Sequence, residues 1–179
     1  GSVVSNAWSA GSITAASRVG GLVGSAETAN LIAFCFSTAS VTGSSERVGG
    51  LIGQSWNSGI IHDSYATGSV RGTSRVGGLV GNNETSSRIE RGFSTGTVNG
   101  TSRVGGLVGN NETSSTVERG FATNTVSGTT QAGGLVGYNG ASSRIEQSFS
   151  TGSVTVSGSI AGGLAGDHRS SVIEDSYAN

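Results

Sequence analysis

Four glutamates recur at one constant spacing along the chain and form the first candidate for chemistry. They are Glu90, Glu118, Glu146 and Glu174. If equivalent positions stack on one another, neighbouring carboxylates lie about 5 Å apart, which is the separation of the acid pair in retaining glycosidases. Repetition alone produces this geometry, however, and Arg88 and Arg144 each precede a glutamate by two residues, on the same side of an extended strand. We therefore expect a solvated, charge-compensated ladder rather than a catalytic pair.

The other reactive side chains are isolated in the sequence. His62 and His168 belong to no His-Glu-x-x-His string and no Cys/His cluster, so we expect exposed turn residues and no metal site. Cys35 occupies a column of small residues, which indicates a buried packing role. There is no P-loop lysine, no Gly-x-Ser-x-Gly elbow and no calcium-binding nonapeptide. The sequence predicts neither an enzyme nor a cofactor.

A row of arginines precedes each Val-Gly-Gly-Leu string and offers a site for an anionic glycan. Its members are Arg18, Arg47, Arg75 and Arg103. Flanking acids favour pairing within the chain instead. Glu84 and Glu112, in identical Asn-Asn-Glu-Thr-Ser-Ser strings, are expected in turns.

Hydroxyl side chains supply the main binding hypothesis. Two columns separated by one residue form a Thr-x-Ser/Thr array, made of Thr38, Ser40, Thr67, Ser69, Thr95, Thr97, Thr123, Thr125, Thr151 and Ser153. Regular arrays of this type resemble the faces of ice-binding solenoids, so ice is one candidate ligand. The alternative is that these hydroxyls bond to nearby backbone groups.

A column of aromatic residues supplies the second binding hypothesis. Its members are Trp8, Phe36, Tyr65, Phe93, Phe121, Phe149 and Tyr177. Facing outward, it would form a stacking platform for sugars. Strand alternation favours that orientation unless the chain bends at Gly92, but little else supplies bulk for a core. We expect the rings to face inward, and Phe93→Ala or Phe121→Ala to cost about 3–5 kcal/mol of stability.

The elements that carry these columns follow from the repeat. The string Gly-Gly-Leu-(Val/Ile/Ala)-Gly begins at Gly20, Gly49, Gly77, Gly105, Gly133 and Gly162, so the copies follow one another at an almost constant interval. Within a repeat, β-branched and aromatic residues alternate with Gly, Ser and Asn, which indicates short strands rather than helices. Stacked copies would cover one another's apolar faces. The sequence predicts an all-β fold, a right-handed parallel β-solenoid of about six 28-residue coils.

Composition narrows the partners. Net charge is −1, so the chain lacks the basic patch that nucleic acid requires. A 20-residue apolar run is also absent, and we expect no membrane span. The 32 glycines exceed the usual share, but in-phase apolar columns argue against disorder. We expect residues 1–179 to form a single solenoid domain, excised from a larger protein.

The repeat resembles a known family. Arg75-Val76-Gly77-Gly78-Leu79-Val80-Gly81 and Tyr65-Ala66-Thr67-Gly68-Ser69-Val70 are similar to the bacterial GLUG-motif repeats. These occur in large secreted or surface-anchored proteins, including adhesins and the accessory regions of some IgA-specific peptidases. The resemblance implies an extracellular or cell-surface location and a structural or adhesive role. The implied partner is a host or matrix surface, either glycan or protein. Ice binding is the alternative and carbohydrate binding the third hypothesis.

Overall fold

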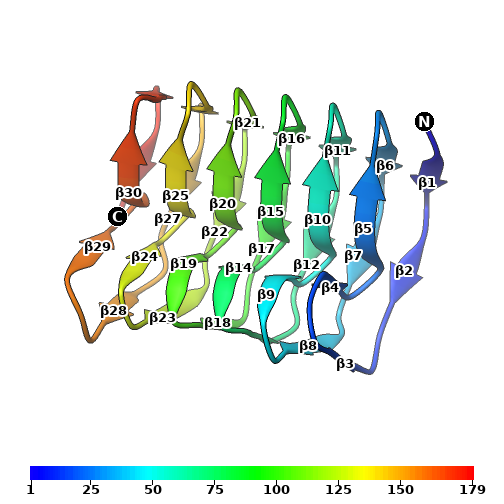
Figure 1. Cartoon of the computed structure of the whole chain (residues 1–179), viewed down its shortest axis with the longest axis horizontal. Coiled ribbons are helices and arrows are strands. Elements are labelled where there is room, and N and C mark those ends of the chain that lie inside the picture. Colours follow the sequence, from blue (N-terminus) through cyan, green and yellow to red (C-terminus); the bar gives the residue numbers. More distant parts are fainter.

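Each repeat folds into five short strands separated by turns. The computed structural model describes residues 1–179 and contains no helix. The strands of successive repeats lie side by side in five parallel sheets, and the chain advances as a right-handed coil (Figure 1). We name the sheets A to E in the order in which the chain visits them: A, B, C, D and then E.

The strand bounds are as follows. Sheet A contains β1 (Val3–Ser5), β6 (Leu31–Ala33), β11 (Ile60–His62), β16 (Arg88–Glu90), β21 (Thr116–Glu118), β26 (Arg144–Glu146) and β31 (Val172–Glu174). Sheet B contains β2 (Trp8–Ser9), β7 (Phe36–Ser37), β12 (Tyr65–Ala66), β17 (Phe93–Ser94), β22 (Phe121–Ala122), β27 (Phe149–Ser150) and β32 (Tyr177–Ala178). Sheet C contains β3 (Ser12–Ala15), β8 (Ser40–Gly43), β13 (Val70–Arg71), β18 (Thr97–Asn99), β23 (Thr125–Gly128) and β28 (Val154–Val156). Sheet D contains β4 (Val19–Gly20), β9 (Glu46–Gly49), β14 (Ser74–Gly77), β19 (Ser102–Gly105), β24 (Gln131–Gly133) and β29 (Ile160–Gly162). Sheet E contains β5 (Val23–Glu27), β10 (Ile52–Trp56), β15 (Val80–Glu84), β20 (Val108–Glu112), β25 (Val136–Gly140) and β30 (Ala165–Arg169).

The register follows the sequence period. Val80 pairs with Val108, and Ile89 with Val117, so like residues stack on like. The offset grows by a single position where an extra residue enters a turn, as between Val19 and Val48. The predicted all-β solenoid of about six coils is confirmed, and the irregularities fall between strands.

Two apolar clusters fill the interior. The larger joins the inner faces of sheets A and E with the leucine of each repeat, such as Leu79 and Leu107. The smaller consists mainly of valines from sheets C and D, including Val98 and Val104. Between the clusters the opposite walls approach closely, since the Ser94 hydroxyl in sheet B donates to the carbonyl of Gly106 at 2.7 Å. The cross-section therefore has a waist between two cores.

The Gly-Gly pair of the repeat makes this waist possible. A Cβ at Gly106 would lie 2.0 Å from the carbonyl oxygen of Gly134 in the next coil and 3.0 Å from the Cβ of Ala122 in sheet B. No side chain fits there, because both the neighbouring coil and the opposite wall are already in contact. The inward positions of sheet B are accordingly small, being Ser37, Ala66, Ser94, Ala122 and Ser150.

The expected inward orientation of the aromatic column is wrong. Trp8, Tyr65 and Tyr177 are exposed and the four phenylalanines are half-buried. The chain does bend, but one residue before the small column, where Arg91 and its equivalents adopt φ near +50°. Gly92 therefore points inward directly after the bend, and Phe93 points outward. The narrow waist accepts only serine or alanine on the inner side.

Because the aromatic rings face outward, truncating one of them should cost less stability than truncating a fully buried ring. Phe121 lies between Phe93 and Phe149, with ring centroids 4.1 and 5.2 Å away. Phe121→Ala should lower the free energy of unfolding by about 1–2 kcal/mol, from partial burial and two stacking contacts. Tyr177→Ala, with one neighbour, should cost less. Chemical denaturation measures both, and a loss above about 3 kcal/mol for Phe121→Ala would contradict the half-buried position.

Buried asparagines form a second internal ladder that the sequence analysis did not predict. Asn83, Asn111 and Asn139 are fully buried and stack in register. The amide of Asn83 donates to Asn111 Oδ1 at 2.8 Å, and that of Asn111 donates to Asn139 Oδ1 at 2.7 Å. The amide of Asn83 also donates to the backbone carbonyl of Ser87, and the amide of Asn111 donates to that of Ser115. The ladder satisfies the buried amide groups of Asn83 and Asn111, and only Asn83 Oδ1, at its end, has no partner.

Candidate binding face

The Thr/Ser array lies on the outside of the solenoid. Nine of its ten residues are exposed and Thr95 is half-buried. The threonine column follows the strands of sheet B, and the Ser/Thr column begins or precedes those of sheet C. Strand alternation turns Ser94 and Val98 inward, so Thr95 and Thr97 point outward. The predicted face is thus available to a ligand.

Most of these hydroxyls have no partner within the protein. Ser69 donates to Ser40 at 3.3 Å, and Thr38 makes a long contact of 3.5 Å with the carbonyl of Ser9. The remaining seven form no hydrogen bond with the chain; they are Thr67, Thr95, Thr97, Thr123, Thr125, Thr151 and Ser153. The alternative role of bonding to local backbone groups therefore does not describe the array.

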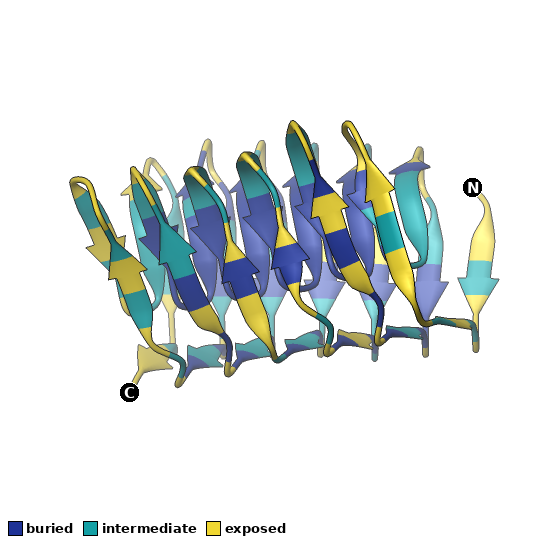
Figure 2. Cartoon of the chain, turned by 90° about the horizontal axis from the view of Figure 1, so that it is seen from below, coloured by how far each residue is buried: buried dark blue, intermediate teal, exposed yellow.

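The array is not one flat surface. Figure 2 views the molecule from below, with sheet C facing the viewer and the short strands of sheet B along the lower border. A corner between Ser94 and Thr97, with Gly96 at φ +99°, separates the two hydroxyl columns. A rigid planar lattice would contact one column at a time.

The aromatic column borders the threonine column on sheet B. Its rings stack on one another, with centroids 4.1 to 6.4 Å apart and most ring planes nearly parallel. Each inner ring therefore turns its faces to its neighbours and its edge to solvent. Stacking of sugars requires a free ring face, so this column does not form the platform considered from the sequence.

The glutamate column on sheet A is compensated by arginines, as expected. Arg88 lies 3.5 Å from Glu90 and also pairs with Glu118, and Arg144 reaches Glu174 at 2.9 Å. In the same sheet region the guanidinium of Arg91, 2.7 Å from Asp63, holds the pKa of that carboxyl far below its usual range, and the hydrogen bond from His62 acts in the same direction. These groups are half-buried or exposed and make a surface ion-pair network.

The remaining candidates are structural. Arg47 and Arg75 pair with Glu46 at 3.4 and 2.6 Å, and Arg103 lies 3.9 Å from Glu112, which confirms pairing within the chain for these three. The same expectation is wrong for Arg18, which has no carboxylate within 4.0 Å. Cys35 is buried in the small column.

Two placements differ from expectation. His62 and His168 lie in strands β11 and β30 rather than in turns, because those strands extend to the bend. Glu84 and Glu112 are likewise the last residues of β15 and β20.

No three His, Cys, Asp or Glu side chains gather as a metal site would require. No helix of the structure is long and apolar enough to span a membrane.

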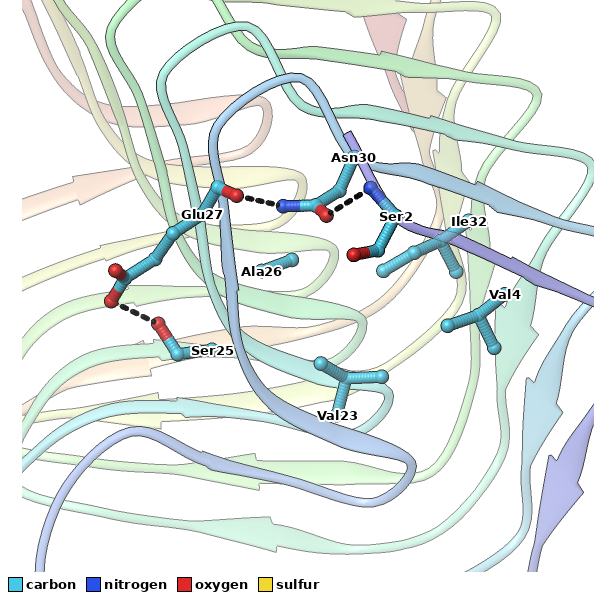
Figure 3. A pocket seen from close by; sticks show the side chains of 8 residues that line it. All are labelled: Ser2, Val4, Val23, Ser25, Ala26, Glu27, Asn30 and Ile32. Carbon is cyan, nitrogen blue, oxygen red and sulfur yellow. Dashed lines mark hydrogen bonds between the residues drawn. The ribbon is translucent and has the colours of Figure 1, made fainter.

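One cavity opens between sheets A and E in the first coil (Figure 3). Its volume is about 330 Å³, and its apolar wall is formed by Val4, Val23 and Ile32. Asn30 spans its rim by accepting a hydrogen bond from the backbone of Ser2. Ala26 stands where Asn83 stands two coils later, so the cavity is interior space that larger side chains fill elsewhere.

The ladders, waist and parallel sheets define a β-solenoid repeat protein. The sequence profile of the GLUG motif matches residues 44–71, 72–99, 100–127 and 128–155, more than half of the chain. The chain belongs to the GLUG-motif family, which confirms the resemblance.

A solved structure shares the fold. The crystal structure described as "a putative immunoglobulin A1 protease from Bacteroides ovatus" superposes with a TM-score of 0.74 and 18% sequence identity. The match covers 93% of this chain and 58% of that one, so this chain spans little more than half of its neighbour's length. No curated protein sequence matches.

Proposed function

We propose that the chain is an adhesive repeat module of a bacterial secreted or surface protein, which binds extracellular glycan through the outer face of sheets B and C. The observation that carries the proposal is the set of seven outward hydroxyls without partners in the protein. Such groups exchange hydrogen bonds with sugar hydroxyls at little cost in desolvation. The family and the description of the structural neighbour support the extracellular location. The role is non-catalytic.

The scaffold suits this role. Each coil is bonded to the next through its backbone and repeats the same hydroxyl pair about every 4.8 Å. A polymeric ligand lying along the solenoid would meet equivalent groups in successive coils, and weak contacts would add. The stacked aromatic column stiffens the same face.

Ice binding is the second candidate, because the two hydroxyl columns of the Thr/Ser array are exposed. The corner between the rows and the Arg71 side chain on sheet C oppose it. We expect no substantial thermal hysteresis from this protein, measured by nanolitre osmometry. Clear hysteresis that depends on the array would establish ice as the ligand instead.

Bulky substitutions in the array test the adhesive role. Thr95→Tyr combined with Thr123→Tyr should leave stability within about 0.5 kcal/mol of the parent, because Thr123 is exposed and the half-buried Thr95 points outward. Binding to an array of immobilised glycans should fall at least severalfold. Thr116→Tyr, on sheet A, is the matched control and should bind as the parent does. Glycan binding that survives the double substitution would place the site elsewhere.

A further inference from the structure

One arginine on the binding face lacks an acidic partner. Of the ten arginines, eight lie within 4.0 Å of a carboxylate oxygen. The two exceptions are Arg18 and Arg71. Arg71 ends strand β13, and its side chain is exposed on the outer face of sheet C. Its charge is therefore free to meet a ligand.

The surroundings of Arg71 carry no compensating charge. Val70 turns inward, so Ser69 and Arg71 share the outer side of the strand. The outward residues of sheet C form two rows, which are Ser12, Ser40, Ser69, Thr97, Thr125 and Ser153 in one and Thr14, Thr42, Arg71, Asn99, Ser127 and Thr155 in the other. Neither row contains an acid. Arg71 is therefore the single positive charge among the hydroxyl and amide side chains of these two rows.

Arg71 also borders a shallow polar groove. The groove has a volume of about 220 Å³ and is lined by Arg71, Gly72, Asn99, Gly100 and Thr101, with no apolar side chain. Asn99 pairs in register with Arg71, one coil away. The side-chain amide of Asn99 and the hydroxyl of Thr101 make no hydrogen bond within the protein. A cation and two neutral polar groups thus converge without internal partners.

We propose that this groove binds a carboxylate group of an acidic polysaccharide, one built from uronic acid sugars. The guanidinium of Arg71 presents a planar pair of donors that matches a carboxylate. Asn99 and Thr101 are placed to bond the hydroxyls of the same sugar or its neighbour. The chain of the polysaccharide continues along the Ser/Thr rows. The inference rests on the proposed glycan-binding function and names its ligand class.

Esterification provides a matched pair of probes. Polygalacturonate and its fully methyl-esterified form share a sugar backbone and differ in charge. The parent should bind the acid form at least about tenfold more tightly than the ester, because a charged hydrogen bond contributes more than a neutral one. The preference should weaken as salt concentration rises. Arg71→Gln should remove the preference, because it weakens binding of the acid form far more than binding of the ester, while Arg18→Gln should retain the preference.

Each of the other outcomes contradicts one defined part of the proposal. Equal affinity of the parent for acid and ester, or a preference that survives Arg71→Gln, overturns the role of Arg71 and leaves the adhesive function standing. Dependence on Arg71 that appears only with sulfated dextran assigns the groove to sulfate rather than carboxylate. Failure of the parent to bind either galacturonan, alginate or any glycan on the array overturns the adhesive function itself.

Discussion

Leu107→Ala should lower the free energy of unfolding by about 2–5 kcal/mol, the range for a buried leucine whose removal leaves a cavity. Leu107 is fully buried in the larger core cluster. Its backbone is held by the coils on both sides, through hydrogen bonds of 2.9 and 2.8 Å with Leu79 and Leu135. The walls around it cannot move inward without breaking these ladders, so the cavity should persist.

The same column supplies the control. Leu164 occupies the equivalent position in the last full coil and is only half-buried. Leu164→Ala should therefore cost clearly less than Leu107→Ala. Urea denaturation followed by far-ultraviolet circular dichroism measures both variants. Equal losses at the two positions would show that burial along the leucine column is uniform, contrary to the structure.

Asn111→Ala should cost about 2–4 kcal/mol, because it leaves buried partners without hydrogen bonds. Asn111 accepts from Asn83 and donates to Asn139, and its amide also approaches the carbonyls of Ser115 and Arg144 at 3.3 and 3.2 Å. Removing the central amide interrupts the ladder on both sides. Water cannot replace it readily inside a closely packed coil.

An exposed asparagine serves as the control, because its substitution removes the same side chain without breaking buried hydrogen bonds. Asn99→Ala removes the same side chain from the outer face of sheet C and should change stability by less than about 0.5 kcal/mol. Thermal unfolding of both variants, with hydrogen exchange of the neighbouring strands, gives the comparison. If Asn111→Ala and Asn99→Ala unfold at the same temperature, the asparagine ladder contributes nothing to the stability of the coil.

The sequence predicted the features that depend on repetition. In a parallel stack, residue n contacts its equivalent in the next coil, so columns read from the chain become ladders in space. The register of Val80 on Val108 and the pairing of Arg88 with Glu118 follow from this rule. The exposed Thr/Ser array follows as well, because outward and inward positions alternate along a strand.

The orientation of the aromatic column could not be read from alternation alone. It depends on where the chain bends, and Arg91 rather than Gly92 takes the left-handed conformation. It also depends on the waist, which exists only when Gly106 of one wall meets Ala122 of the other. Those two residues belong to opposite walls of the coil, and no pattern within a single strand relates them.

The sequence by itself determined the all-β character of the chain, the parallel ladders, the period of the coil and the family, because each is a property of one repeat and its copies. Only the tertiary structure decided which wall faces which. That contact turned the rings outward, and the closing of the coil around its interior buried Asn111. The physical reason is that distances across the coil depend on how five strands close around a shared interior, and no periodicity in the chain encodes them.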